Sequence, residues 1–248
     1  MNEHDRRRRS SGVARVAVWV SSVAACGLPL GVAGTHAGLW APLVGFGLFV
    51  MSGLLGGLLG VVLGGAGLFL TRGGRDPLGW RRALQAAGLG SGLLIVVLVS
   101  AAPGRGLPRI NDITTDLADP PRFGADIPDY AGRDMSYPPK FVERVRLAYP
   151  DLGTVDMDLQ PQQAFERALI SAESLGWEIS SRRPDSGCFD ARDRTAVFRF
   201  VDDVTVRVRP SDGGSRIDVR SKSRDGQGDL GANAARIRRF IEELNSAR

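Results

Sequence analysis

The stretch that decides the fold is VTVRVRPSDGGSRIDVRSKSR, residues 204–224. On both sides of its turn, SDGG at residues 211–214, apolar and polar side chains alternate, which is the period of a half-buried strand. These residues therefore predict a hairpin with one apolar face. The apolar side chains on that face are Val204, Val206, Val208, Ile217 and Val219.

Further strand-like runs lie upstream, at residues 155–159, 177–181, 188–193 and 196–200. The last run would add Phe198 and Phe200 to the apolar face, with a turn at residues 201–203. Two helices are expected, because apolar residues recur at helical spacing after Pro161 and again after Gly231. This order predicts an α+β domain over residues 153–248, with an antiparallel sheet of about four to five strands and two helices on one face.

Three apolar stretches precede the domain, from Val16 to Gly34, from Leu43 to Leu70 and from Ala83 to Ala102. About 20 apolar residues cross the hydrocarbon of a bilayer, so residues 16–102 predict three transmembrane helices. No charged residue or histidine lies within them, which favours an anchor over a pump or channel. A cleaved signal peptide is the alternative for the first stretch, but the two later stretches favour an uncleaved helix.

The flanking arginines predict the orientation, because basic residues beside short loops stay in the cytoplasm. Residues 1–15 carry Arg6–Arg9 and Arg15, and four more arginines separate the second span from the third. The connection between the first and second spans has no Lys or Arg. The N-terminus is therefore expected in the cytoplasm and the C-terminal domain outside it.

Glycines recur at four-residue intervals in the apolar stretches, as in Gly56, Gly60 and Gly64 and in Gly88 and Gly92. Such spacing lets helix backbones approach closely. It predicts packing within one three-helix bundle, and a homo-oligomer joined by these helices is the alternative.

The distribution of charge limits the partners. Residues 1–104 hold nine arginines and three acidic residues, whereas the rest of the chain holds 23 basic and 24 acidic residues. A nucleic-acid partner is not expected, because the domain lacks the excess of cations that phosphates require. No disulfide is expected either, since Cys26 lies in an apolar stretch and Cys188 in the polar half.

Residues 103–152, called the arm below, are rich in Pro and Asp. Their eight prolines exclude a long helix, although residues 140–148 have the pattern of a short one. We expect either a spacer or an extended arm that wraps the domain.

Three motifs of the chain stand out: INDITTDLADPP from Ile110, DDVTVRVRP from Asp202 and SRIDVRSKSRDGQGDLGANAARIRRF from Ser215. Together they resemble the bacterial and plastid family known as domain of unknown function fourteen ninety-nine. The resemblance covers roughly residues 109–246. The family has no assigned activity, so the resemblance implies no catalytic or binding residues.

The polar face of the predicted sheet carries mostly cations, which would attract an anionic lipid head group or glycan. The predicted ligand-binding residues are Arg199, Arg207, Arg209, Asp218, Arg220 and Arg224. The alternative is a solvated face whose arginines pair with acidic residues of the domain or the arm.

A second group of residues is predicted to hold the structure together. Residues of NDITTD would form a turn that pins the arm to the domain. Asp229 would cap the last helix. The glycine-rich loop before that helix resembles a phosphate-binding loop only superficially. The group comprises Asn111, Asp112, Thr115, Asp203, Asp229 and Asn233.

No catalytic residue, metal site or cofactor is predicted. Both histidines, His4 and His36, precede the domain, so neither is placed to serve Cys188 or a serine as a base. We expect a membrane-anchored protein of the bacterial inner membrane, part of the cell envelope. Its domain would bind, without catalysis, an anionic lipid or glycan or another envelope protein.

Two alternatives belong to other classes. The first is an envelope hydrolase or transferase that uses Asp112, Asp203 or Asp218 together with Arg207 and Arg220. The second is a structural subunit whose glycine-rich helices pack against a partner in the membrane.

Overall fold

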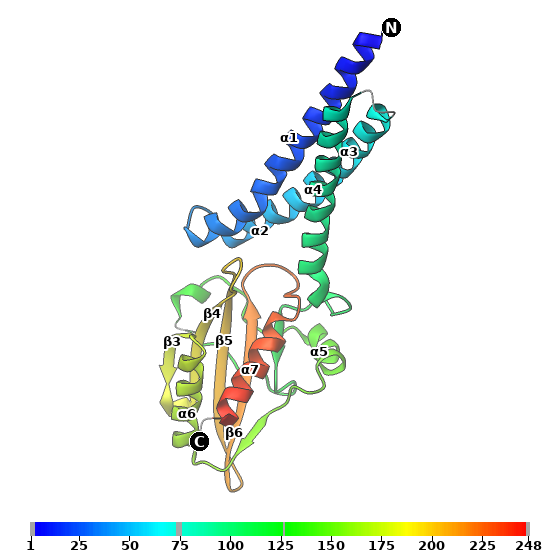
Figure 1. Ribbon diagram of the computed structural model, residues 1–248. Coiled ribbons are helices and arrows are strands. Elements are labelled where there is room, and N and C mark those ends of the chain that lie inside the picture. Colours follow the sequence, from blue (N-terminus) through cyan, green and yellow to red (C-terminus); the bar gives the residue numbers. More distant parts are fainter. Residues whose placement is uncertain (1–2, 73–75, 126, 247–248) are drawn as a thin grey trace. The chain divides into compact units, whose positions relative to one another are not determined.

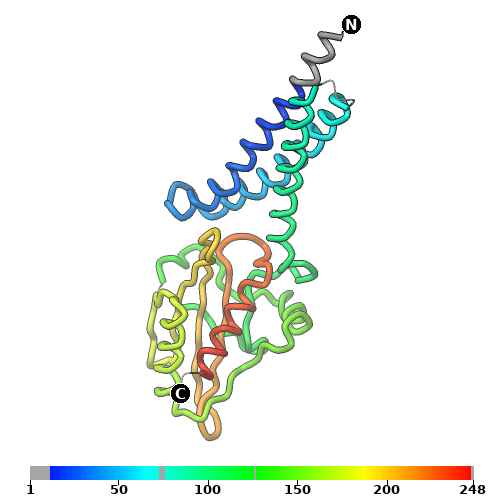
Figure 2. Tube along the Cα trace, in the orientation of Figure 1, coloured from blue at the N-terminus to red at the C-terminus, as the bar shows by residue number. Residues whose placement is uncertain are grey.

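The computed structural model describes residues 3–72, 76–125 and 127–246, with side chains from residue 12 onward. The chain forms two compact units, a helical unit up to Pro103 and a mixed unit of residues 104–196 and 200–248. Figure 1 shows the elements of each unit, and Figure 2 traces the chain through them. The side chains of Arg6–Arg9 and Arg75, used above to predict orientation, lie outside the described residues.

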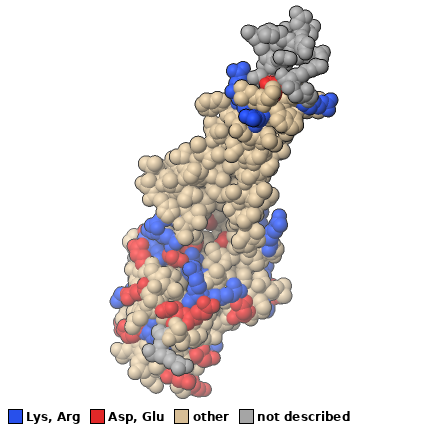
Figure 3. All heavy atoms as spheres, viewed as in Figure 1, with Lys and Arg blue, Asp and Glu red and all other residues tan. Residues whose placement is uncertain are grey.

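The helical unit consists of α1 (Glu3–His36), α2 (Pro42–Met51), α3 (Gly57–Thr71) and α4 (Pro77–Ala101). A π-helical turn, Ser52–Gly56, joins α2 to α3 without a break. Three segments are long and apolar enough to cross a membrane, Gly12–His36, Pro42–Thr71 and Pro77–Gly104. Three helices of membrane-spanning length and composition, as the sequence predicts, are therefore confirmed. In Figure 3 the helical unit is uncharged along most of its length, with basic residues gathered at one end.

The third span begins earlier than expected. Asp76 caps α4 by accepting a hydrogen bond from the backbone N–H of Gly79 at 2.8 Å, and Pro77 takes the first helical position. Arg81 and Arg82 therefore lie in the first turns of α4 and not in the connection before it.

Glycines allow the helices of this unit to touch. A Cβ added at Gly64 of α3 would lie 2.6 Å from the backbone nitrogen of Ala87 in α4. Gly88 and Gly92 of α4, by contrast, are exposed, with nothing within 4 Å of an added Cβ. Helix packing within the chain therefore explains the need for glycine at position 64. For Gly88 and Gly92, a contact in a homo-oligomer stays a prediction.

The mixed unit contains a six-stranded antiparallel sheet, which confirms the predicted α+β class. Its strand order is β1 (Asp112–Thr114), β6 (Gly214–Ser223), β5 (Val201–Ser211), β4 (Cys188–Arg194) and β3 (Glu178–Arg183). The sixth strand, β2 (Val155–Met157), pairs with the first half of β6, and β1 pairs with its second half. The sheet exceeds the expected size because the arm supplies β1.

Two helices, α6 (Pro161–Ser174) and α7 (Ala232–Ser246), cover one face of the sheet (Figure 1). Phe165 of α6 meets Phe189 edge to face, and Phe240 of α7 stacks on Trp177. The five apolar side chains predicted on this face from the hairpin are buried, whereas Phe198 and Phe200 are only partly buried, in the connection between β4 and β5. A third helix, α5 (Val142–Ala148), lies on the β6 side of the sheet, within the segment expected to contain a short helix.

The strand expected at residues 196–200 is wrong. These residues lie in the connection between β4 and β5, which Thr195 closes with two hydrogen bonds to Phe200. The expected turn at residues 201–203 is wrong as well, because these residues begin β5. Asp202 and Asp203 look like turn residues, but each is ion-paired with an arginine and so lies buried in a strand.

Candidate functional site

The arm covers the polar face of the sheet, opposite α6 and α7. The hydroxyl of Thr205 in β5 donates to the carbonyl of Arg122 at 3.5 Å, and the carboxylate of Asp190 in β4 accepts from the backbone N–H of Gly124 at 3.2 Å. A small apolar cluster in the arm contains Phe123, Ile127 and Tyr130. The segment is therefore a docked arm and not a spacer.

Arg220 is the centre of a first ion-pair cluster on this covered face. Its guanidinium donates from Nε to Asp112 Oδ1 at 2.8 Å and from Nη2 to Asp112 Oδ2 at 2.7 Å. Lys222 Nζ lies 3.1 Å from the same carboxylate, and the carbonyls of Pro121 and Met135 accept the other guanidinium hydrogens. Arg220 is only 1% exposed, so the expectation that it faces solvent is wrong, because the arm closes over it.

A second cluster joins Arg207 and Arg209 of β5 to three aspartates. Asp218 Oδ2 lies 3.2 Å from Arg207 Nη2 and 2.7 Å from Arg209 Nη2, while Asp116 and Asp119 of the arm contact both arginines. Burial raises the pKa of Asp116, but hydrogen bonds from the Asp119 backbone N–H and from Arg209 outweigh it, so that pKa lies below its usual value. The carboxylate therefore stays ionised and paired at neutral pH.

A third cluster surrounds the buried carboxylate of Asp203. Arg224 donates to it from Nε and Nη2 at distances of 2.7 to 3.1 Å, and Arg133 of the arm donates from Nη1 at 2.9 Å. Arg224 also donates to Asp129 at 3.1 Å, and this hydrogen bond holds the pKa of Asp129 below its usual value. Here too, side chains of the arm form ion pairs with oppositely charged side chains of the sheet.

Of the predicted ligand-binding residues, Arg207, Arg209, Asp218, Arg220 and Arg224 gather on the covered face. Arg199 does not, because it lies in the β4–β5 connection with a left-handed φ of 57°. Each arginine on the face has a carboxylate partner from the same chain. Ligand binding by this group stays a prediction, and an incoming anion would have to compete with those aspartates.

The NDITTD motif attaches the arm by a strand, since Asp112 belongs to β1 and gives its carboxylate to Arg220. The expected turn lies at its last residue, Asp116, whose carboxylate accepts from the backbone N–H groups of Ala118 and Asp119 at 3.0 Å. Asn111 Nδ2 donates to the carbonyl of Gly226 at 2.8 Å. The hydroxyl of Thr115 accepts from the backbone N–H of Val219 at 2.9 Å. Consecutive residues of the motif therefore contact β6 and the loop that follows it.

Asp229 and Asn233 organise the start of α7. The carboxylate of Asp229 accepts from the backbone N–H groups of Gly231 at 2.9 Å and Asn233 at 2.7 Å. The Asn233 side chain accepts from the hydroxyl of Ser221 at 2.6 Å and donates to that of Ser223 at 2.9 Å. The helix is thereby fixed to the last strand.

Arg236 is a structural residue that the sequence analysis missed. It belongs to α7, is 2% exposed, and donates to Asp202 at 2.5 Å and to Asp193 at 2.6 Å. Burial raises the pKa of Asp202, although its ion pair with Arg236 opposes the shift. The available signal was an arginine directly before Ile237, on the apolar side of the helix.

A basic pocket of about 430 Å3 lies elsewhere on the mixed unit. Its lining consists of Arg109, Asn111, Pro138, Lys140, Phe141, Arg144, Gly226 and Gln227. No acidic residue lines it. Among the described residues, none of its three basic side chains has an ion-pair partner, and Lys140 only approaches the ring of Phe141, at 5.6 Å.

The sequence did not predict this pocket, because Arg109 is far in sequence from Lys140 and Arg144. Arg109 precedes β1. Lys140 lies in the 3-10 turn Pro139–Phe141, directly before α5, and Arg144 lies in the first turn of α5. The spacing of Lys140 and Arg144, four residues apart on one helical face, was the available signal. The glycine-rich loop lines the pocket through Gly226, while Asp229 already occupies N–H groups at the start of α7.

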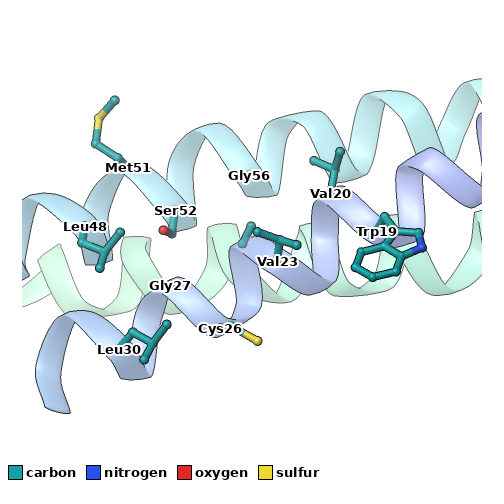
Figure 4. Close-up of a pocket in the computed structure, with 11 residues that line it drawn as sticks. Trp19, Val20, Val23, Cys26, Gly27, Leu30, Leu48, Met51, Ser52 and Gly56 are labelled. Atoms are coloured by element: carbon teal, nitrogen blue, oxygen red, sulfur yellow. The ribbon is translucent and has the colours of Figure 1, made fainter. Parts of the chain in front are cut away.

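A larger hollow, of about 750 Å3, opens on the helical unit (Figure 4). One side of it is α1, and the other side is α2 with the π-helical turn. Gly27 faces Ser52 there, and a Cβ added to the glycine would lie 2.0 Å from the serine hydroxyl. The lining is otherwise mostly apolar, with Trp19, Val20, Val23, Leu30, Leu48 and Met51. It contains no charged residue, as expected of a surface in contact with lipid tails.

The carboxylates that the alternative hydrolase or transferase would use are held in ion pairs. Asp112, Asp203 and Asp218 are each 0% exposed, and at least one arginine contacts each of them. None of the three lines either hollow described above. Within the described part of the chain, no three His, Cys, Asp or Glu side chains gather where a metal ion would bind.

Residues 112–244 match the family described as "Protein of unknown function (DUF1499)". The match begins at β1 and ends within α7, so it includes the docked arm from Asp112 onward and leaves out the helical unit. No curated protein matches the chain.

Proposed function

We propose that this chain, which belongs to the DUF1499 family of proteins of unknown function, is a membrane-anchored envelope protein with a phosphate-binding domain. The helical unit would be the anchor in the bacterial inner membrane. The mixed unit would lie outside the cytoplasm and act without catalysis. The observation that carries this proposal is the basic pocket, where Arg109, Lys140 and Arg144 meet without an acidic residue.

The contrast with the covered face supports an anionic ligand. On that face the aspartates of the chain neutralise Arg207, Arg209, Arg220 and Arg224. Within the described part of the chain, the three cations of the basic pocket have no such internal partner. Arginine presents a planar fork of N–H donors that matches phosphate oxygens, and lysine adds a point charge, so the pocket has the donors that a phosphate group requires.

The state of the carboxylates supports binding over catalysis. A general acid or base must reach the proton that it transfers. Buried ion pairs within the fold instead hold the carboxylate oxygens of Asp112, Asp203 and Asp218. The rival hydrolase or transferase would have to break these pairs before it could act.

Phosphate should stabilise the full chain in neutral detergent. At ten times its Kd, a ligand that binds only the folded state adds about 1.4 kcal/mol to the free energy of unfolding. We expect inorganic phosphate to raise the melting temperature above that in chloride at equal ionic strength. The variant Arg109→Gln/Lys140→Gln/Arg144→Gln should lose this increase.

The matched control is Arg122→Gln/Arg167→Gln/Arg239→Gln, which removes three other cations that lack ion-pair partners among the described residues. It should retain the effect of phosphate. An equal increase in both triple variants would show that the basic pocket does not bind phosphate.

The proposed location has its own test. A periplasmic reporter such as alkaline phosphatase, fused after Arg248, should be active, because the arginine-rich flanks favour a cytoplasmic N-terminus and three spans place the C-terminus on the other side. A cytoplasmic reporter at the same position should be silent. Activity of the cytoplasmic fusion alone would reverse the proposed orientation.

A further inference from the structure

The short helix α5 and the residues just before it present two faces. Phe141 and Val145 are 5% and 1% exposed and belong to the core. Lys140, Arg144 and Leu147 follow the spacing i, i+4 and i+7, which places them on a second face. Leu147 is 73% exposed, so a large apolar side chain stands in solvent beside two residues of the basic pocket.

This combination is typical of a surface that meets a membrane. Peripheral membrane helices place basic residues beside apolar ones, so that the cations contact anionic head groups while the apolar side chains enter the acyl boundary. A small soluble anion would need the cations but would gain nothing from the exposed Leu147.

The chain also tethers the pocket close to a bilayer surface. Arg109 lies eight residues beyond Ala101, the last residue of α4, and eight extended residues span at most about 28 Å. A second exposed leucine, Leu230, lies against Gly104 in this connection, where an added Cβ would be 2.5 Å from its Cδ2 atom. If α4 crosses the membrane, the pocket therefore cannot move far from the head groups at the end of that helix.

We infer that the basic pocket takes the phosphate of an anionic phospholipid head group from the membrane that holds the helical unit, while Leu147 enters the interface. This inference rests on the proposed function and adds the source of the phosphate. Arg109, Lys140 and Arg144 contact the phosphate oxygens, and the apolar side chain separates a lipid from a soluble phosphate ester. No bond is formed or broken.

The test uses the full chain, purified in neutral detergent and exposed to equal amounts of phosphatidylglycerol and phosphatidylcholine. Native mass spectrometry then counts the lipids that stay bound. The wild type should retain phosphatidylglycerol over phosphatidylcholine, and Arg109→Gln/Lys140→Gln/Arg144→Gln should lower that preference about tenfold. The control Arg122→Gln/Arg167→Gln/Arg239→Gln should keep it, since it removes the same charge elsewhere on the mixed unit.

A second pair of variants separates the lipid from free phosphate. Leu147→Ser should reduce the retention of phosphatidylglycerol several-fold but leave the stabilisation by inorganic phosphate intact. Ile170→Ser, at a side chain of α6 that is 60% exposed, is its control and should change neither measurement.

The outcomes are distinguishable. If phosphate stabilises the wild type while the pocket variant and its control retain phosphatidylglycerol equally, the lipid inference is wrong and the proposed function stands. If the pocket variant also responds to phosphate as the wild type does, both are wrong. Equal retention by Leu147→Ser and Ile170→Ser overturns the role of the exposed leucine in selecting a lipid.

Discussion

Arg220→Gln is expected to lower the free energy of unfolding of the mixed unit by about 3–5 kcal/mol, the usual cost of removing one partner from a buried ion pair. The carboxylate of Asp112, which is 0% exposed, would lose both of its bonds to the guanidinium. The carbonyls of Pro121 and Met135 would lose their donor as well. Thermal unfolding of the full chain in detergent, followed by circular dichroism, measures this loss.

Limited proteolysis should find the arm of this variant cut between Asp112 and Tyr137, because Arg220 holds the arm on the sheet. The matched control is Arg216→Gln, on the same face of the same strand. Arg216 is exposed and makes only a 3.8 Å contact with Asp156, so we expect its loss to cost about 0.5 kcal/mol or less. Equal melting of the two variants would show that Arg220 is not a structural residue.

The double variant Asp112→Asn/Arg220→Gln tests the ion pair directly. If the charges act on each other, the double variant should lose less stability than the two single variants added together. Simple additivity would mean that the cost of Arg220→Gln comes from other contacts.

Gly64→Leu should disrupt the helical unit. A Cβ at this position would lie 2.6 Å from the backbone nitrogen of Ala87 and 2.9 Å from the carbonyl of Ala83, and backbone atoms cannot move aside as a side chain can. Overpacking of this kind costs about 1–3 kcal/mol, and here it must separate α3 from α4. We expect a lower melting temperature and a smaller yield of monodisperse protein in detergent.

The control is the next residue in the chain. Gly65 is exposed, and an added Cβ there meets nothing within 4 Å. Gly65→Leu should therefore be neutral or slightly stabilising, because leucine forms helix more readily than glycine. A similar loss in both variants would point to the insertion of the apolar segment, and not to the contact between helices, as the step affected.

Much of the fold was predictable, because local composition and period determine it. Apolar stretches without charges placed three membrane-length helices, and strict alternation placed the hairpin of β5 and β6 and its buried valines. Two local patterns gave wrong predictions, because long-range strand pairing overrides them. Residues 196–200 alternate like a strand but form a connection, and the aspartates at 202 and 203 suggest a turn but lie in β5.

The candidate site was less predictable. Alternation correctly placed Arg207, Arg209 and Arg220 on the polar side of the sheet, but it carries no information on what covers that side. Apart from Asp218 in β6, the partners of these arginines lie about 90 to 110 residues earlier, in an arm with little secondary structure. The three cations of the basic pocket likewise come from two segments, one with Arg109 and one with Lys140 and Arg144, which meet only when the arm docks.

The sequence by itself determined which segments suit a membrane, which residues form the core of the sheet and where the last two helices lie, because these depend on hydrophobicity and period along a short window. Only the tertiary structure decided which charged side chains form ion pairs within the fold and which are available to a ligand. The reason is that charge pairing depends on distance in space. Arg220 pairs with Asp112 across the folded sheet and is buried. Arg109, Lys140 and Arg144 instead line one pocket together and have no ion-pair partner among the described residues.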